Sequence, residues 1–125
     1  PLTAETAKDP QNDAQRKQLI DLLRPFGRSM RPPGDAFYKL QESAAARMDA
    51  GDVAKAIELY HRASNVAPWY VGTYMDLGMA YERAKDWRQA VRYYDLFLYA
   101  GKDYSAVPAE IGIIQEARKR AAQKR

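Results

Sequence analysis

A period of 34 residues is the feature that most constrains the fold of this chain. Residues of similar size or character recur at this spacing (74 − 40 = 34, for example) in five pairs: Leu40 and Tyr74, Ala44 and Gly78, Asp52 and Asp86, Ala56 and Ala90, Tyr60 and Tyr94. Repeats of this length with small residues at fixed positions are typical of helix–turn–helix units that stack on a neighbour to bury an apolar face. The sequence therefore predicts an all-α repeat fold.

Composition limits the chemistry of the chain. Because its 125 residues include no cysteine, it can form no disulfide and has no thiolate ligand or nucleophile. No run approaches the roughly 20 apolar residues that cross a bilayer. The net charge of +4 comes from a basic C-terminal tail that contains Arg118, Lys119, Arg120, Lys124 and Arg125. We expect these cations to complement the end of a helix, and contact of the tail with nucleic acid or a membrane is the less favoured alternative.

Residues 1–34 are expected to form a polar segment with one short helix, over residues 13–24. Apolar side chains recur there at helical spacing: Leu19, Ile20, Leu22 and Leu23. Prolines and glycines between residues 25 and 34 predict an extended connector. Residues 35–125 are therefore expected to form the domain, and the short helix either caps the repeats or occupies their groove.

Cap and turn residues divide residues 35–125 into five predicted helices. Asp35 is the expected N-cap of the first helix, which runs to residue 49. Gly51-Asp52 makes the turn, and Asp52 is the N-cap of the second helix. A third helix follows to residue 85. Asp86, with Gln89 three residues later, predicts a capping box for the fourth, which ends at Gly101. The fifth begins near residue 108.

These residues resemble the tetratricopeptide repeat family. The resemblance implies a short right-handed superhelix of stacked antiparallel helix hairpins, an α-solenoid, with repeat one at 37–70, repeat two at 71–104 and a capping helix at 105–121. It implies close helix packing at ten positions: Ala44, Ala56, Tyr60, Pro68, Tyr74, Leu77, Gly78, Tyr81, Ala90 and Tyr94.

The resemblance also implies a concave groove lined by the first helix of each repeat. The candidate groove residues are Tyr38, Gln41, Ala45, Met48, Asp49, Met75, Met79, Glu82, Arg83 and Ile113, with Glu116 beside them. Methionine side chains re-pack easily, which suits an apolar helix or extended peptide. Burial of Met48, Met75 and Met79 beneath neighbouring helices is the alternative.

The sequence predicts a non-catalytic interaction or scaffold module for a protein or peptide partner. Self-assembly into a homo-oligomer, or a structural place in a larger complex, is the alternative. We predict no catalytic residue, metal, cofactor or small-molecule substrate. His61 is the only histidine and is expected at a solvated helix surface, and the carboxylates form no evident acid–base pair.

The compartment stays open at this stage. The chain starts at Pro1, which suggests a mature or excised form. A proline-rich connector before such repeats resembles bacterial envelope proteins. Two locations therefore remain as alternatives: the bacterial cell envelope, as a periplasmic or membrane-anchored mature form, and the cytoplasm.

Overall fold

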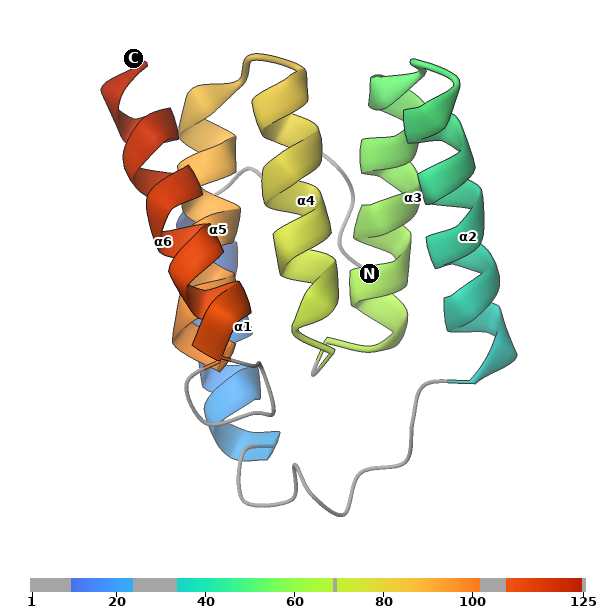
Figure 1. The fold of residues 1–125 in the computed structure, drawn as a ribbon. Helices are drawn as coiled ribbons and strands as arrows, with labels where there is room; N and C mark the ends of the chain where they lie inside the picture. The colour runs from blue at the N-terminus through green and yellow to red at the C-terminus, as the bar shows by residue number, and fades with distance from the viewer. Residues whose placement is uncertain (1–9, 24–33, 69, 102–107, 125) are drawn as a thin grey trace.

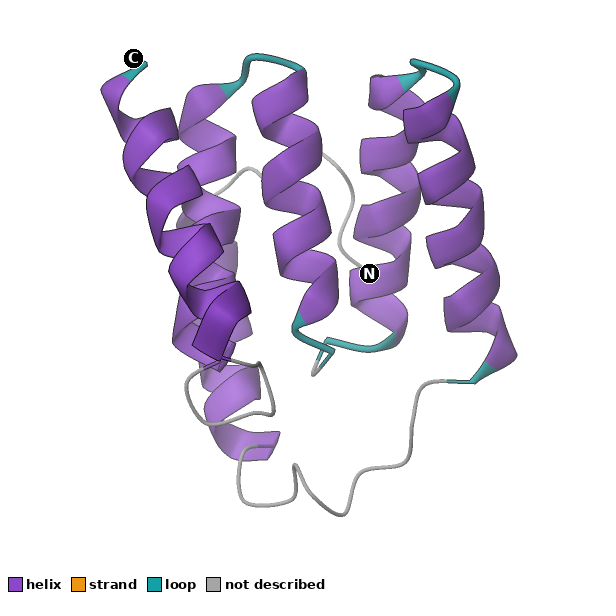
Figure 2. Ribbon diagram, viewed as in Figure 1, coloured by secondary structure: helices purple, strands orange, loops and turns teal. Residues whose placement is uncertain are grey.

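The computed structural model describes residues 10–23, 34–68, 70–101 and 108–124, which form helices and turns without a strand (Figure 2). The helices are α1 (Pro10–Leu23), α2 (Asp35–Asp49), α3 (Val53–Val66), α4 (Gly72–Arg83), α5 (Trp87–Gly101) and α6 (Pro108–Gln123). The predicted all-α fold is confirmed. The predicted extended connector lies almost wholly outside the described residues.

Two helix hairpins stand side by side (Figure 1). Helices α2 and α3 form the first hairpin, α4 and α5 form the second, and α3 packs against α4 between them. Helix α6 packs on α5 in front of it in Figure 1, whereas α1 packs on α5 from behind. The stack therefore has first helices α2, α4 and α6, and second helices α3 and α5.

Both hairpins turn in the same way, as the 34-residue period predicts. Gly51 has φ of +84° and Lys85, 34 positions later (85 − 51), has φ of +62°. The amide of the following residue, Asp52 or Asp86, donates to the carbonyl five residues back at 2.9 Å. A left-handed conformation suits glycine and strains lysine, so the second turn carries backbone strain that the first does not.

The cap of α2 differs from the prediction. Gly34 is the N-cap residue and makes no side-chain cap, while Asp35 is the first helical residue. Its negative charge still lies at the positive end of the helix dipole. Asp52 caps α3 as predicted, because its side chain accepts from the Lys55 amide at 3.2 Å.

Half of the predicted capping box of α5 is present. The Asp86 carboxylate accepts from the Gln89 amide at 3.4 Å. The Gln89 side chain instead accepts from Arg92 Nη1 at 2.9 Å. The glutamine therefore braces the next turn of α5 rather than the start of the helix.

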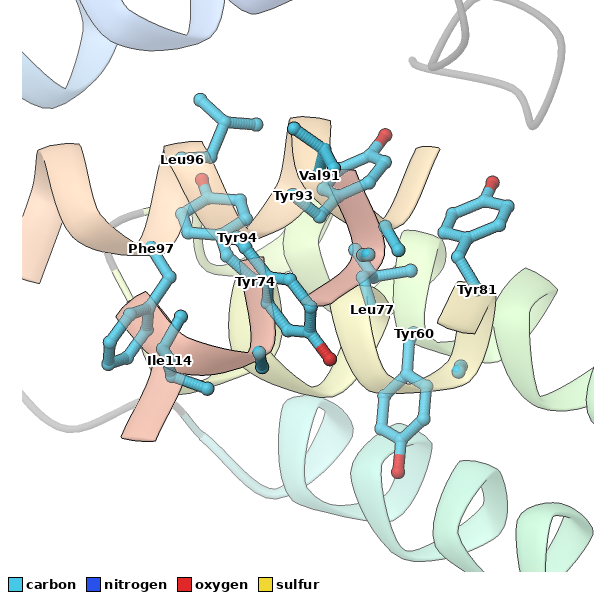
Figure 3. Packing of buried hydrophobic residues seen from close by; sticks show 14 of the residues in the cluster. Tyr60, Tyr74, Leu77, Tyr81, Val91, Tyr93, Tyr94, Leu96, Phe97 and Ile114 are labelled. Carbon is cyan, nitrogen blue, oxygen red and sulfur yellow. The ribbon is translucent and has the colours of Figure 1, made fainter. Parts of the chain in front are cut away.

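The core lies between the four helices of the hairpins and α6, and Ile20 of α1 also belongs to it (Figure 3). Of the ten residues expected in close packing, Pro68 is half-buried, and the buried ones are Ala44, Ala56, Tyr60, Tyr74, Leu77, Gly78, Tyr81, Ala90 and Tyr94. A Cβ atom at Gly78 would stand 2.4 Å from the Tyr94 ring. Glycine thus lets the ring of α5 lie directly on the backbone of α4.

His61 is buried, which contradicts the expected solvated position. Its Nε2 atom makes a 2.8 Å hydrogen bond with the Tyr81 hydroxyl, and its ring packs edge-on against Tyr81 and Tyr93. The two tyrosine rings stack on each other at 5.5 Å. The prediction failed because α5 brings Tyr93 across the seam onto α3, a contact that the pattern of α3 alone does not contain.

Helix α1 neither caps the repeats nor covers the first helices. Its Ile20 is fully buried, and the buried Arg16 donates to the Ser64 carbonyl at 3.1 Å and to Asn65 Oδ1 at 3.3 Å. These acceptors lie at the C-terminal end of α3, where a cation is favoured by the helix dipole. Further contacts reach α5 through the pairs Asp13–Arg92 and Asp21–Tyr99. Helix α1 therefore packs on the second helices.

Replacement of Gly78 by alanine tests the α4–α5 contact. We expect Gly78→Ala to lower the free energy of unfolding by about 1–3 kcal/mol, because the new methyl group overlaps the Tyr94 ring. Urea denaturation measures the change.

Gly112→Ala in α6 is the matched control, since a Cβ there meets nothing within 4 Å. Helix propensity should make that variant more stable by up to about 1 kcal/mol. Similar losses in both variants would contradict the packing explanation.

Candidate functional site

The first helices are joined side by side by polar contacts. Three of these contacts span them: Gln41 Nε2 to Asp76 Oδ2 at 3.4 Å, Arg83 Nη1 to the Met48 carbonyl at 3.0 Å, and Arg120 Nε to Glu82 Oε2 at 2.7 Å. The first two join α2 to α4, and the third joins α4 to α6. We call the surface that these helices share the first-helix face.

Helical spacing assigns the residues of the first-helix face, because positions three or four apart lie on one side of a helix. They are Tyr38, Gln41, Ala45, Met48 and Asp49 of α2, Met75, Asp76, Met79, Glu82 and Arg83 of α4, and Ile113 and Glu116 of α6. This set consists of the groove residues predicted from the sequence with Asp76 added, and their role in binding stays a prediction.

Each first helix exposes one large apolar side chain on this face. Tyr38 is 42% exposed, Met79 51% and Ile113 66%. Ala45 is exposed as well. Met48 and Met75 are half-buried and pack against the core. One of the three methionines is thus open to solvent, and the other two are partly buried against the core.

The charged groups at the α4–α6 contact satisfy one another. Glu82 accepts from Arg120 at both carboxylate oxygens and from the Tyr94 hydroxyl at 2.7 Å. The hydrogen bond from Arg120, and then that from Tyr94, lower the pKa of Glu82 despite partial burial. Glu82 is therefore a structural carboxylate that fixes α6 beside α4.

The pKa of the Asp76 carboxyl is raised. Burial raises it from the ordinary value of 3.8 to about 6, and the hydrogen bond from Gln41 opposes the rise. The nearby Tyr60 of α3 has its pKa raised to about 12, by burial first and then by Asp76 and Asp49. Figure 3 shows the Tyr60 ring extending toward α2. Asp76 thus lies in the seam between α2 and α4.

Asp76 was not among the groove residues predicted from the sequence. A signal was present, because Thr73 and Ala80 lie three residues before it and four after it, on the same side of α4, and both are fully buried. A carboxylate on the side of small buried residues indicates a desolvated position.

The basic tail is engaged with the rest of the fold. Arg118 pairs with Asp95, Arg120 pairs with Glu82, and the Lys124 ammonium lies 6.0 Å from the centre of the Trp87 ring. These cations anchor α6 to α4 and α5.

The described residues contain no group of three or more histidine, aspartate or glutamate side chains arranged to hold a metal ion. None of the helices α1 to α6 combines the length and apolar character needed to cross a bilayer.

The raised pKa of Asp76 predicts how stability depends on pH. The pKa of Asp76 is about 6 in the folded chain and 3.8 ordinarily, so between these values the folded chain binds the proton more strongly than the unfolded chain. The free energy of unfolding therefore falls as the pH rises from 3.8 to about 6. We expect Asp76→Asn to increase the free energy of unfolding by about 1–3 kcal/mol at pH 7.5 and by less than about 1 kcal/mol at pH 4.

Urea denaturation of both proteins at the two pH values measures this difference. A gain of the same size at both pH values, or a loss at pH 7.5, would contradict the desolvation of this carboxyl.

The comparisons with known proteins agree with this architecture. Neither a protein-family model nor a curated protein matches the sequence. Among solved structures, the chain is similar to a tetratricopeptide repeat domain protein from Salinibacter ruber, determined in solution by NMR. The two share 22% identity and a TM-score of 0.63 over 74% of this chain and 92% of the other. The chain therefore has the fold of a tetratricopeptide repeat domain, a short helical solenoid.

Proposed function

We propose that the chain is a non-catalytic interaction module that holds an apolar segment of a partner protein against its first-helix face. The observation that carries the proposal is that each first helix exposes one large apolar side chain, Tyr38, Met79 or Ile113. A folded chain gains nothing by exposing such groups, whereas a partner that covers them gains the free energy of apolar burial.

The chemical character of these side chains supports a peptide or helix as the ligand of the first-helix face. Tyr38 offers a large ring with a polar tip, which suits an interface that is apolar at its centre and wet at its rim. Met79 adapts to partners of different shape through its flexible thioether. Met48 and Met75 are half-buried and pack against the core, so a partner side chain that contacts them would lie close to the core.

The opposite side of the molecule supports the choice of the first-helix face. Helix α1 already packs on α3 and α5 there, through buried Ile20 and Arg16. No two of the first helices form a closely packed helix pair among the described residues, and the polar contacts described above join them to one another.

Self-assembly into a homo-oligomer is the second candidate, since α2 ends the stack without a further described helix. Apart from Tyr38, its exposed residues are mostly small or charged: Asp35, Ala36, Lys39, Glu42, Ser43, Ala45, Ala46, Arg47 and Asp49. Stable homodimer interfaces are richer in large apolar groups. The end of the stack therefore favours a separate partner over a second copy.

Selection of peptides from a randomised display library tests the proposal. We expect Met79→Glu to weaken binding of the selected peptides at least about tenfold, because a carboxylate would have to be buried against apolar groups. Fluorescence anisotropy with a labelled peptide measures the affinity.

Leu22→Glu on α1 is the matched control, since Leu22 is also an exposed apolar residue, 69% exposed, but lies outside the first-helix face. Its affinity should equal that of the wild type. If the two variants bind equally well, or only Leu22→Glu loses binding, the first-helix face is not the binding surface. Sedimentation at increasing protein concentration distinguishes self-assembly from binding of a separate partner, because self-assembly predicts that the mass rises with concentration.

A further inference from the structure

The chemistry of the seam between α2 and α4 indicates what the partner segment carries besides apolar side chains. The Gln41 amide donates to Asp76 Oδ2 at 3.4 Å, while Gln41 Oε1 is buried without a hydrogen-bond partner among the described residues. The side chain that donates to Asp76 therefore carries an amide oxygen that no described donor satisfies.

An unmet acceptor in a buried position is unfavourable until a donor reaches it. Asp76 is half-buried as a residue, so the seam is not wholly closed to an incoming group. The side chains that bring several N–H donors to such a place are lysine and arginine. Rotation of the Gln41 amide, which Asp76 alone now orients, would expose its oxygen to the same donor.

The charge of the first-helix face agrees with a cationic ligand. Asp49 and Glu116 are exposed, and neither they nor Asp76 form an ion pair with a described cation. Of the cations at this face, Arg120 is paired with Glu82, and Arg83 donates to a backbone carbonyl of α2. The face is therefore acidic although the chain as a whole carries a net charge of +4.

We propose that Gln41 and Asp76 form a subsite for a lysine or arginine side chain of an otherwise apolar partner segment, whose remaining side chains lie on Met75, Met79 and Ile113. This inference rests on the proposed function of the first-helix face. It narrows the partner to a segment that combines apolar residues with at least one basic residue.

The experiment uses peptides selected by the wild-type chain from a randomised display library. Wild type should enrich lysine or arginine at one position between apolar residues, and Asp76→Asn should lose that enrichment while still selecting apolar residues. Glu58→Gln on α3 is the matched control for net charge, because it removes a carboxylate outside the first-helix face and should leave the basic preference unchanged.

The affinity of one selected lysine peptide is then measured by fluorescence anisotropy at pH 5 and pH 7.5. Because the cation needs an ionised Asp76, whose pKa is about 6 in the free chain, wild type should bind about tenfold more tightly at pH 7.5. Tyr60 of α3, with a pKa of about 12, stays protonated throughout, and Asp49 of α2 is the other titratable group near this seam.

Two controls isolate the subsite: Asp76→Asn and a peptide with norleucine in place of lysine should each show little pH dependence. The basic subsite is wrong if Met79→Glu abolishes binding but the preference for lysine or arginine is missing or survives in Asp76→Asn. It is also wrong if Glu58→Gln lowers the affinity as much as Asp76→Asn does. If Met79→Glu has no effect, or wild type selects no peptide, the proposed function and the subsite both fall.

Discussion

The close approach of α4 and α5 at Gly78 is the constraint on which the rest of the structure depends. The Tyr94 ring lies where any other residue at position 78 would place its Cβ, 2.4 Å away. With the ring in that place, its hydroxyl donates to Glu82, which in turn accepts from Arg120 of α6. The glycine at position 78 thus allows the close packing of the second hairpin. The contacts of Glu82 with Tyr94 and Arg120 then place α6 beside α4.

The two sides of the stack differ in how they meet solvent. On the second helices, α1 supplies an apolar contact through Ile20 and a buried cation, Arg16, at the negative end of α3. On the first helices, Met79 and Tyr38 remain exposed, whereas Met48 and Met75 are half-buried. A two-repeat solenoid has a small core, so a helix that covers one side adds buried area without using the side proposed for the partner.

The period of the sequence predicted the helices and turns because helix length, turn position and small packing residues all repeat locally. Contacts between helices far apart in sequence were not predictable in this way. His61 is buried against Tyr81 of α4 and Tyr93 of α5, and Asp76 is desolvated in the seam where Gln41 of α2 contacts it. The left-handed conformation of Lys85 was hidden by its residue type, although Gly51 occupies the equivalent turn. The residues of the first-helix face follow from the repeat register, whereas their role in binding stays a prediction.

A methyl NMR titration tests the central claim most directly, that the first-helix face binds the partner segment. The chain, labelled at its methyl groups, is titrated with a peptide that wild type selects from the library. The account predicts shifts concentrated on Met75, Met79 and Ile113, with the exposed Leu22 and Val66 of α1 and α3 unchanged. Shifts concentrated on Leu22 and Val66, or spread equally over both sets, would contradict it.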